Sequence, residues 1–332
     1  MLTATTPTRM NKKLVLEGLY PATITPFTAD MEVDYCLLED HLRDTCEAPG
    51  VSGIAVNGGL GELLQLTLEE QVKIVELALQ VRRPGQLIIA GLEGRSAREV
   101  IASGRVLKAA GAEAFLVLPP FDVRAYRRLA AAPSEVYKFF QRVDEALDVP
   151  MIVFQYPPAS GLPYTVEALL RISTLENVVG IKAASGNLET YQELWDALHE
   201  RVSVMVALDS PPLLPMLEHG AHGALIGISA IVPEKWSELL ALVKKGETAK
   251  AHTLFDKVCR PLMASVFENQ QPKRLTNEAA AVKEALVQLG RLSSSRVREP
   301  AVDVNDEVRH DIFQSLVAAG LLACQGSGTH QK

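Results

Sequence analysis

The stretch that decides the fold runs from Val178 to Gly186 and reads VVGIKAASG. It opens as a nearly continuous apolar run, which is typical of a strand buried on both faces of a parallel sheet. The charged Lys182 stands at the end of this run. Lysine is rarely fully buried unless it is paired, so a lysine here is either a reactive amine or a side chain that reaches water beyond the strand end. Position alone leaves these two interpretations open.

Seven further apolar runs of similar length accompany this one, and longer amphipathic segments alternate with them. The eight predicted strands are Tyr20–Pro26, Gly53–Asn57, Leu87–Gly91, Ala114–Leu118, Pro150–Phe154, Val178–Lys182, Val202–Leu208 and Gly223–Ile228. Helices are predicted at Leu66–Gln80, Ser96–Ala110, Ser134–Leu147, Val166–Ile172 and Leu188–His199. Eight strand–helix units in succession predict a parallel sheet that closes as an α/β (β/α)8 TIM barrel. An open doubly wound sheet is the alternative, but no G-x-G-x-x-G turn follows the first strand.

Helix punctuation supports this pattern and sets the domain organisation. Thr67 and Glu70 have the spacing of a capping box, and Gly111 and Gly220 stand where glycines end helices. After Pro233 the strands stop, and only helical patterns follow. These are Glu234–Lys245, Thr248–Phe267, Asn277–Leu289 and Asp306–Leu322. We therefore expect a barrel over residues 16–245, a helical extension over 246–324, and flexible termini at 1–15 and 325–332.

Composition narrows the class of protein. The 332 residues carry a formal net charge of −7, whereas binders of nucleic acid and of membrane surfaces usually present a basic face. No apolar run approaches the ~20 residues of a membrane span, and the polar N-terminus lacks the apolar stretch of a signal peptide. The sequence predicts a soluble, cytoplasmic globular protein.

Cysteine and histidine spacing argues against a metal centre. Four scattered cysteines form no C-x-x-C pair, which is typical of a reducing compartment without a disulfide framework. His219, His222 and His252 do not have the spacing of metal ligands. We therefore expect neither a metal nor another cofactor.

Active sites of (β/α)8 barrels lie at the C-terminal ends of the strands, where Lys182 is expected. Desolvation lowers the pKa of a lysine and makes its amine nucleophilic. Such an amine attacks a ketone to give a Schiff base.

Four segments resemble motifs of the dihydrodipicolinate synthase/N-acetylneuraminate lyase family, in the family's order and over nearly the whole chain. They are Gly18–Phe27, Gly58–Glu62, Asn177–Gly186 and Gly220–Gly223, with the sequences GLYPATITPF, GGLGE, NVVGIKAASG and GAHG. The resemblance implies a class I lyase in which Lys182 forms the Schiff base with pyruvate or another 2-oxo acid. It also implies a homo-oligomer, a tetramer or a dimer.

Several positions depart from the family pattern. Gly59 and Leu60 replace a threonine pair that binds the substrate carboxylate, although backbone N–H groups remain available there. Phe154 stands in place of the catalytic tyrosine, and Ala159 in place of the arginine of the synthases. Phe121 and Asp122 replace a tyrosine pair of the synthases. These losses argue against the lysine-biosynthetic reaction.

The reaction still needs a base to move a proton. Tyr156 is the nearest substitute, because alternate strand residues share a face and place it about 6.6 Å beyond Phe154. The alternative is that Tyr156 only packs beside Pro157. Glu62 is expected to accept backbone hydrogen bonds beneath its loop rather than to react.

Further residues are assigned to substrate binding with the help of the resemblance. They are Thr25, Gly58, Gly59, Leu60, Phe154, Ser185, Asp209 and Leu225. Ser185 and Ser229 are equally suited to capping a following helix.

The segments Pro157–Gly161, Lys283–Leu286 and Val297–Pro300 resemble sugar-acid dehydratases of the same family. This favours a 2-keto-3-deoxy sugar acid as substrate, with loss of water or cleavage of a carbon–carbon bond. Two alternatives stay open, namely a non-catalytic homologue that senses a 2-oxo acid and a 4-hydroxy-tetrahydrodipicolinate synthase.

Overall fold

The structure is a computed structural model that describes residues 14–120, 132–157, 163–267 and 277–323. Nearly all of the two predicted flexible termini lies outside these ranges. Phe121, Asp122 and Ala159, which depart from the family pattern, also lie outside the described residues.

Eight parallel strands form one sheet in the order β1-β8-β7-β6-β5-β4-β3-β2. Their bounds are β1 Gly18–Leu19, β2 Gly53–Val56, β3 Leu87–Leu92, β4 Ala114–Val117, β5 Met151–Gln155, β6 Val178–Ala183, β7 Ser203–Val206 and β8 Gly223–Ala224. Single bridges from Leu19 to Val51 and from Ala22 to Ala55 link the chain at and after β1 to the chain at and before β2, so the sheet is nearly closed into a ring. The predicted (β/α)8 TIM barrel is therefore confirmed.

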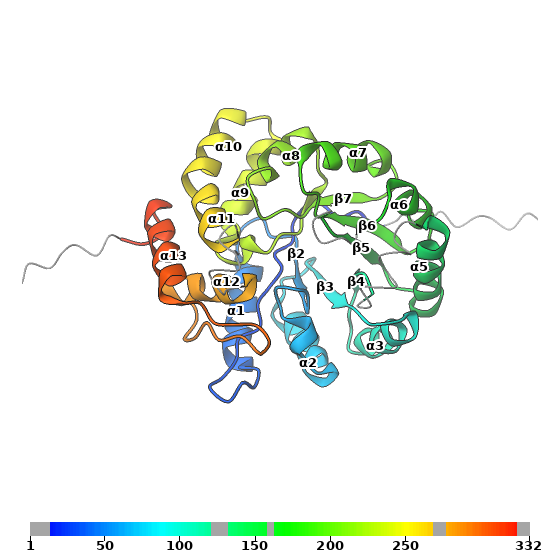
Figure 1. Ribbon diagram of the computed structural model, residues 1–332, viewed down its shortest axis with the longest axis horizontal. Helices are drawn as coiled ribbons and strands as arrows, with labels where there is room; N and C mark the ends of the chain where they lie inside the picture. The colour runs from blue at the N-terminus through cyan, green and yellow to red at the C-terminus, as the bar shows by residue number, and fades with distance from the viewer. Residues whose placement is uncertain (1–13, 121–131, 158–162, 268–276, 324–332) are drawn as a thin grey trace, which may run out of the picture.

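Helices surround the strands on the outside of this ring (Figure 1). They are α1 Tyr35–Glu47, α2 Leu68–Val81, α3 Ala97–Ala109, α5 Pro133–Leu147, α6 Val166–Ile172, α7 Leu188–Leu198, α8 Leu213–His219 and α9 Pro233–Lys244. Short 3₁₀ turns lie at η1 Leu63–Gln65 and η3 Ile228–Ala230. The capping box of Thr67 and Glu70 is present in both directions, as predicted.

The first and last strands are shorter than the sequence predicts. The expected strand Tyr20–Pro26 is wrong in its bounds, because the ladder between β1 and β8 ends at Leu19. Beyond Leu19 the backbone forms hydrogen bonds to the chain on either side of it. The Ala22 N–H donates to the carbonyl of Ile226 after β8, and the Thr23 N–H donates to the carbonyl of Ala55 in β2. Prolines in this segment lack the N–H that a regular ladder requires.

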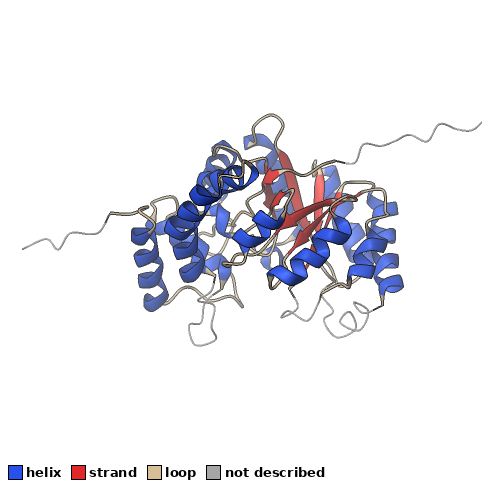
Figure 2. Cartoon of the chain, turned by 90° about the horizontal axis from the view of Figure 1, so that it is seen from above, coloured by secondary structure: helices blue, strands red, loops and turns tan. Residues whose placement is uncertain are grey.

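The helices after the barrel gather on one side of it (Figures 1 and 2). They are α10 Thr248–Leu254, the π-helical turn η4 Phe255–Cys259, α11 Arg260–Val266, α12 Glu278–Gln288 and α13 Asp306–Ala318. The long helix predicted at Thr248–Phe267 is thus one helical run with a π-turn inside it. None of the helices in the described ranges is long and apolar enough to cross a bilayer.

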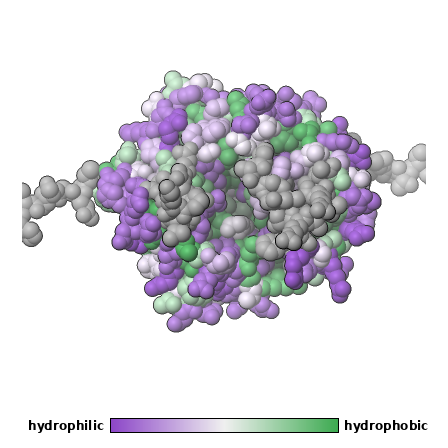
Figure 3. Space-filling model, in the orientation of Figure 1, coloured by the Kyte–Doolittle hydropathy of each residue, from purple (hydrophilic) through white to green (hydrophobic). Residues whose placement is uncertain are grey.

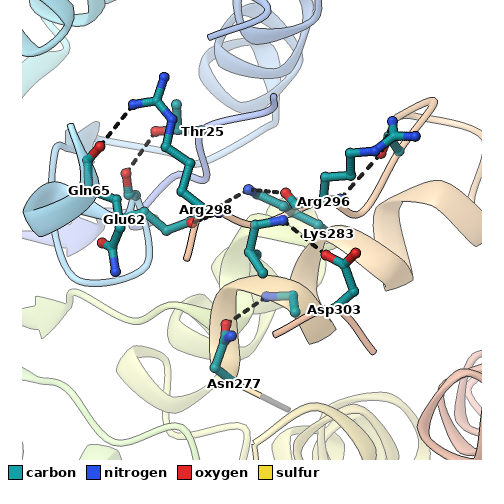
Figure 4. Close-up of polar contacts among 12 residues, drawn as sticks. Thr25, Glu62, Gln65, Asn277, Lys283, Arg296, Arg298 and Asp303 are labelled. Carbon is teal, nitrogen blue, oxygen red and sulfur yellow. Dashed lines mark hydrogen bonds and ion pairs between the residues drawn. The ribbon is translucent and has the colours of Figure 1, made fainter. Parts of the chain in front are cut away.

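A buried ion pair fastens this extension to the barrel (Figure 4). The amine of Lys283 on α12 is fully buried and lies 2.5 Å from a carboxylate oxygen of Glu62, which follows β2. The other carboxylate oxygen of Glu62 accepts the backbone N–H of Arg298 at 3.0 Å. Phe27 receives both cations on its ring, with Lys283 Nζ at 4.3 Å and Arg298 Cζ at 4.5 Å from the ring centroid. Glu62 is therefore structural, as expected, although its lysine partner was not foreseen.

Removing one partner of this pair leaves the other buried without compensation, which typically costs about 3–5 kcal/mol. We expect Lys283→Met to lower the free energy of unfolding by that amount in denaturant titrations at pH 7. The double variant Lys283→Met/Glu62→Gln recovers part of the loss, because no buried charge remains unpaired.

The matched control is Lys235→Met, which removes a lysine from the exposed Lys235–Glu238 pair. It should leave the unfolding midpoint unchanged, since exposed ion pairs contribute little. Equal losses in Lys283→Met and Lys235→Met would contradict a stabilising role for the buried pair.

Candidate active site

A cavity of about 530 Å³ opens at the C-terminal ends of the strands. Small and apolar side chains make up much of its wall, with a few polar groups among them. The lining residues are Ala22, Ala55, Gly58, Gly59, Leu60, Leu116, Phe154, Tyr156, Pro157, Lys182, Ala184, Ala207, Leu208, Asp209, Ser210, Gly227, Phe267 and Glu278. Figure 3 shows one face of the molecule, with hydrophilic residues mainly at its periphery and more hydrophobic ones towards its middle.

Lys182 projects into this cavity from β6, directly beside Phe154 on β5 in the sheet register. Its Nζ lies 4.0 Å from the centroid of the Phe154 ring. Burial lowers the pKa of Lys182 from its ordinary value to about 8, against the opposing charges of Asp209 and Glu278. A lysine of this kind carries an appreciable neutral fraction near neutral pH, so its amine is poised for nucleophilic attack.

Asp209 lies after β7, where the sequence places it. One carboxylate oxygen accepts the backbone N–H of Ile228 at 2.8 Å. Burial raises the pKa of Asp209, while this hydrogen bond and the charge of Lys182 act in the opposite direction. The carboxylate joins the ends of β7 and β8 and places a negative charge within range of the Lys182 amine.

The end of β5 places two aromatic rings beside the lysine. The rings of Phe154 and Tyr156 have centroids 4.5 Å apart, and both line the cavity. Gln155 between them points away and is buried, and its amide group forms two 2.9 Å hydrogen bonds with the backbone of Tyr164. These bonds hold the strand end, and Tyr156 is the phenol that this end brings to the cavity. Burial, with the charges of Glu93 and Glu278, raises the pKa of Tyr156.

The loop after β2 offers backbone donors rather than hydroxyls. Gly58, Gly59 and Leu60 all line the cavity. Within the described ranges no hydrogen-bond acceptor takes the N–H groups of Gly59 and Leu60. Successive free amides of this kind suit an anion. The hydroxyl of Thr25 supports the loop from below by donating to the carbonyl of Gly61 at 2.8 Å.

Three of the predicted substrate-binding residues lie outside the cavity wall. Thr25 is engaged by the loop, and Leu225 is completely buried at the end of β8. Ser185 is buried after β6, and its hydroxyl has no hydrogen-bond partner among the residues described. It does not cap α7, because Asn187 does so. A direct role for these three residues in binding stays a prediction.

The sequence-based reasoning missed three residues around the cavity. Phe267 and Glu278 reach the cavity from the helical extension, and no local pattern in a helix indicates which distant pocket it will face. Glu93 follows β3 and acts electrostatically on Tyr156. Like Asp209, Glu93 is a charged residue shortly after a buried strand, and this position is the signal by which the sequence could have indicated it.

The described ranges contain no group of three or more histidine, cysteine, aspartate or glutamate side chains that could hold a metal ion.

Residues 15–319 match the model of the Dihydrodipicolinate synthetase family. The chain belongs to this family, and it is an enzyme, a lyase of the Schiff-base class.

Its relatives agree with this assignment over their full lengths. The chain is 32% identical to a protein of Pyrobaculum arsenaticum named an uncharacterized DapA-like lyase, covering 92% of this chain and 99% of the relative. It is 27% identical to a 4-hydroxy-tetrahydrodipicolinate synthase of Methanosarcina mazei, covering 93% and 100%. The dihydrodipicolinate synthase of Acinetobacter baumannii, solved with pyruvate, superposes with a TM-score of 0.81 at 26% identity, covering 92% and 99%.

The lowered pKa of Lys182 gives a testable pH dependence. An amine with a pKa of about 8 is about 10% neutral at pH 7, roughly two hundred times the neutral fraction of an ordinary lysine. We expect reductive methylation of the Lys182 peptide, followed by mass spectrometry, to rise with pH to a midpoint near 8. N-acetyl-lysine in the same reaction serves as the internal reference, and equal midpoints for the two amines would contradict the perturbed pKa.

Proposed function

We propose that this protein is a lyase that forms a Schiff base between Lys182 and a 2-oxo acid, with a 2-keto-3-deoxy sugar acid as its substrate. The observation that carries the proposal is the amine of Lys182, which is desolvated in a cavity at the C-terminal end of the barrel and has a pKa of about 8. The neutral amine attacks the ketone carbon, and loss of water gives the imine. Once protonated, the imine draws electrons away from the neighbouring carbon.

The free amides of Gly59 and Leu60 are suited to the carboxylate of such a substrate. This carboxylate lies next to the ketone in every 2-oxo acid, so a short distance between the amides and Lys182 is required. Both the loop and the lysine line the same cavity, so one bound molecule can contact both. Backbone donors bind the carboxylate without the two hydroxyls that the family pattern supplies.

The choice of a sugar acid rests on the surroundings of the amine. Phe154 lies against Lys182 where the family's synthases carry a phenol, and a phenyl ring cannot exchange a proton with the imine. The remaining polar groups in the wall, Asp209, Ser210 and Glu278, are suited to the hydroxyls of a polyol chain. The second step is then loss of the C4 hydroxyl or cleavage of the C3–C4 bond.

Borohydride reduction tests the first step directly. Incubation with pyruvate or 2-keto-3-deoxygluconate and borohydride should add the mass of the reduced adduct to the Lys182 peptide. Lys182→Met should abolish both the adduct and turnover, because methionine fills a similar volume and has no amine. The outcome that would sink the proposal is the absence of any adduct across a panel of 2-oxo acids, in a wild-type protein shown to be folded by its thermal transition.

A second candidate is favoured by the names of the relatives, several of which are 4-hydroxy-tetrahydrodipicolinate synthases. This reaction condenses pyruvate with aspartate semialdehyde. We expect no condensation above background, because Phe154 supplies no phenol at the imine. Consumption of aspartate semialdehyde that depends on pyruvate and on Lys182 would replace the sugar-acid assignment and keep the Schiff-base step.

The homo-oligomer and the cytoplasmic location stay predictions. Sedimentation of the purified protein would establish the number of subunits.

A further inference from the structure

Glu93 is a carboxylate that has no hydrogen-bonding or charged partner in residues 14–120, 132–157, 163–267 and 277–323. It is half-buried and immediately follows β3. Among the residues that the structure describes, it forms neither a hydrogen bond nor an ion pair. Burial alone raises the pKa of Glu93 from its ordinary value to about 7. An uncompensated carboxylate is costly to bury, and such groups cluster at functional sites.

The register of the sheet shows which way Glu93 points. Leu92 pairs with Val117, and Val117 pairs with Val153. The next residue on each strand therefore continues the row as Glu93, Leu118 and Phe154, and the row ends at Lys182, which pairs with Phe154. Residues in register in a parallel sheet share a face. Glu93 is therefore on the inward face, in the same row as the two cavity residues Phe154 and Lys182.

The charges that act on the Lys182 amine differ from those that act on the Tyr156 phenol, and Glu93 is among the second set only. The pKa of Lys182 responds to Asp209 and Glu278, whereas that of Tyr156 responds to Glu93 and Glu278. Glu93 therefore lies within electrostatic range of the phenol. On its own segment the nearest charges are Arg95 and Glu99, which pair with each other at the surface. The titratable group of the site that Glu93 influences is thus the phenol of Tyr156.

This inference rests on the proposed function and supplies its missing base: we propose that Tyr156 and Glu93 form the proton relay of the enzyme, with Tyr156 in contact with the substrate and Glu93 behind it.

The two proton transfers of this relay occur together, so no free tyrosinate is formed. The phenol oxygen of Tyr156 takes the proton from C3 of the imine while the phenol proton passes to the carboxylate of Glu93. The C3–H electron pair becomes the C2–C3 double bond of the enamine, and the C=N electron pair moves to nitrogen. Glu93 ends neutral and Tyr156 ends as a phenol. The carboxylate of Glu93, whose negative charge disfavours a tyrosinate at Tyr156, is thus also the group that accepts the phenol proton.

Exchange of the methyl protons of pyruvate for deuterium in D₂O tests the relay, because it needs only the imine and the base. At saturating pyruvate the wild type should exchange with a rate that rises with pH through about 7, as Glu93 ionises. We expect Glu93→Gln to slow exchange by about a hundredfold or more and to lose this pH dependence. Borohydride trapping at Lys182 should be retained, which shows that the variant is folded and forms the imine.

Tyr156→Phe should lose exchange to the same extent, and Glu93→Gln/Tyr156→Phe should lose no more than either single variant, as groups that act as a unit do. Glu99→Gln, in the exposed pair on the same segment, is the matched control and should exchange at the wild-type rate. Normal exchange in either single variant, with its adduct intact, overturns the relay and leaves the Schiff base standing. Absence of the adduct in the wild type instead overturns the proposed function.

Discussion

The buried contact between Lys283 and Glu62 is the constraint on which the site depends. It joins α12 of the extension to the end of the loop after β2, at a glutamate whose backbone is left-handed with φ of 58°. The same loop presents the amides of Gly59 and Leu60 to the cavity. The pair therefore fixes one wall of the active site and, through α12, brings Glu278 to another. Any other arrangement of α12 and this loop would leave one of the two charges buried without a partner, which is strongly destabilising.

The amine of Lys182 owes its reactivity to this enclosure. A lysine at a strand end that faced water would keep its ordinary pKa, whereas burial among Phe154 and small side chains lowers it to about 8. Asp209 and Glu278 act against this shift and keep the amine within the range of neutral pH. The site thus combines a nucleophilic amine with two acidic side chains in the cavity wall. These side chains suit the hydroxyls of an uncharged polyol chain that extends from the carboxylate end of the substrate.

Much of the site followed from sequence because the relevant signal is local. Lys182 ends a predicted strand, and Tyr156 and Asp209 come shortly after one. Together with the family resemblance these positions singled out the three residues, and all three line the cavity. Glu93 stands at the same kind of position, shortly after β3. Thr25 lies outside the cavity wall, where its hydroxyl donates to the carbonyl of Gly61. The direction of such a hydrogen bond depends on a neighbour that the strand pattern does not contain.

The sequence by itself predicted the barrel. Eight apolar runs separated by helical patterns indicate eight β–α units, and a parallel sheet of eight such units buries both faces of every strand when it closes as a barrel. It also singled out Lys182 as the candidate nucleophile, because this is the lysine that ends one of the eight predicted strands and its segment resembles the Schiff-base motif of the family. The tertiary structure decided the pKa of that lysine, the partner of Glu62 and the entry of Glu278 and Phe267 into the cavity wall. These depend on desolvation and on contacts between segments up to 221 residues apart, and no pattern along the chain encodes either one.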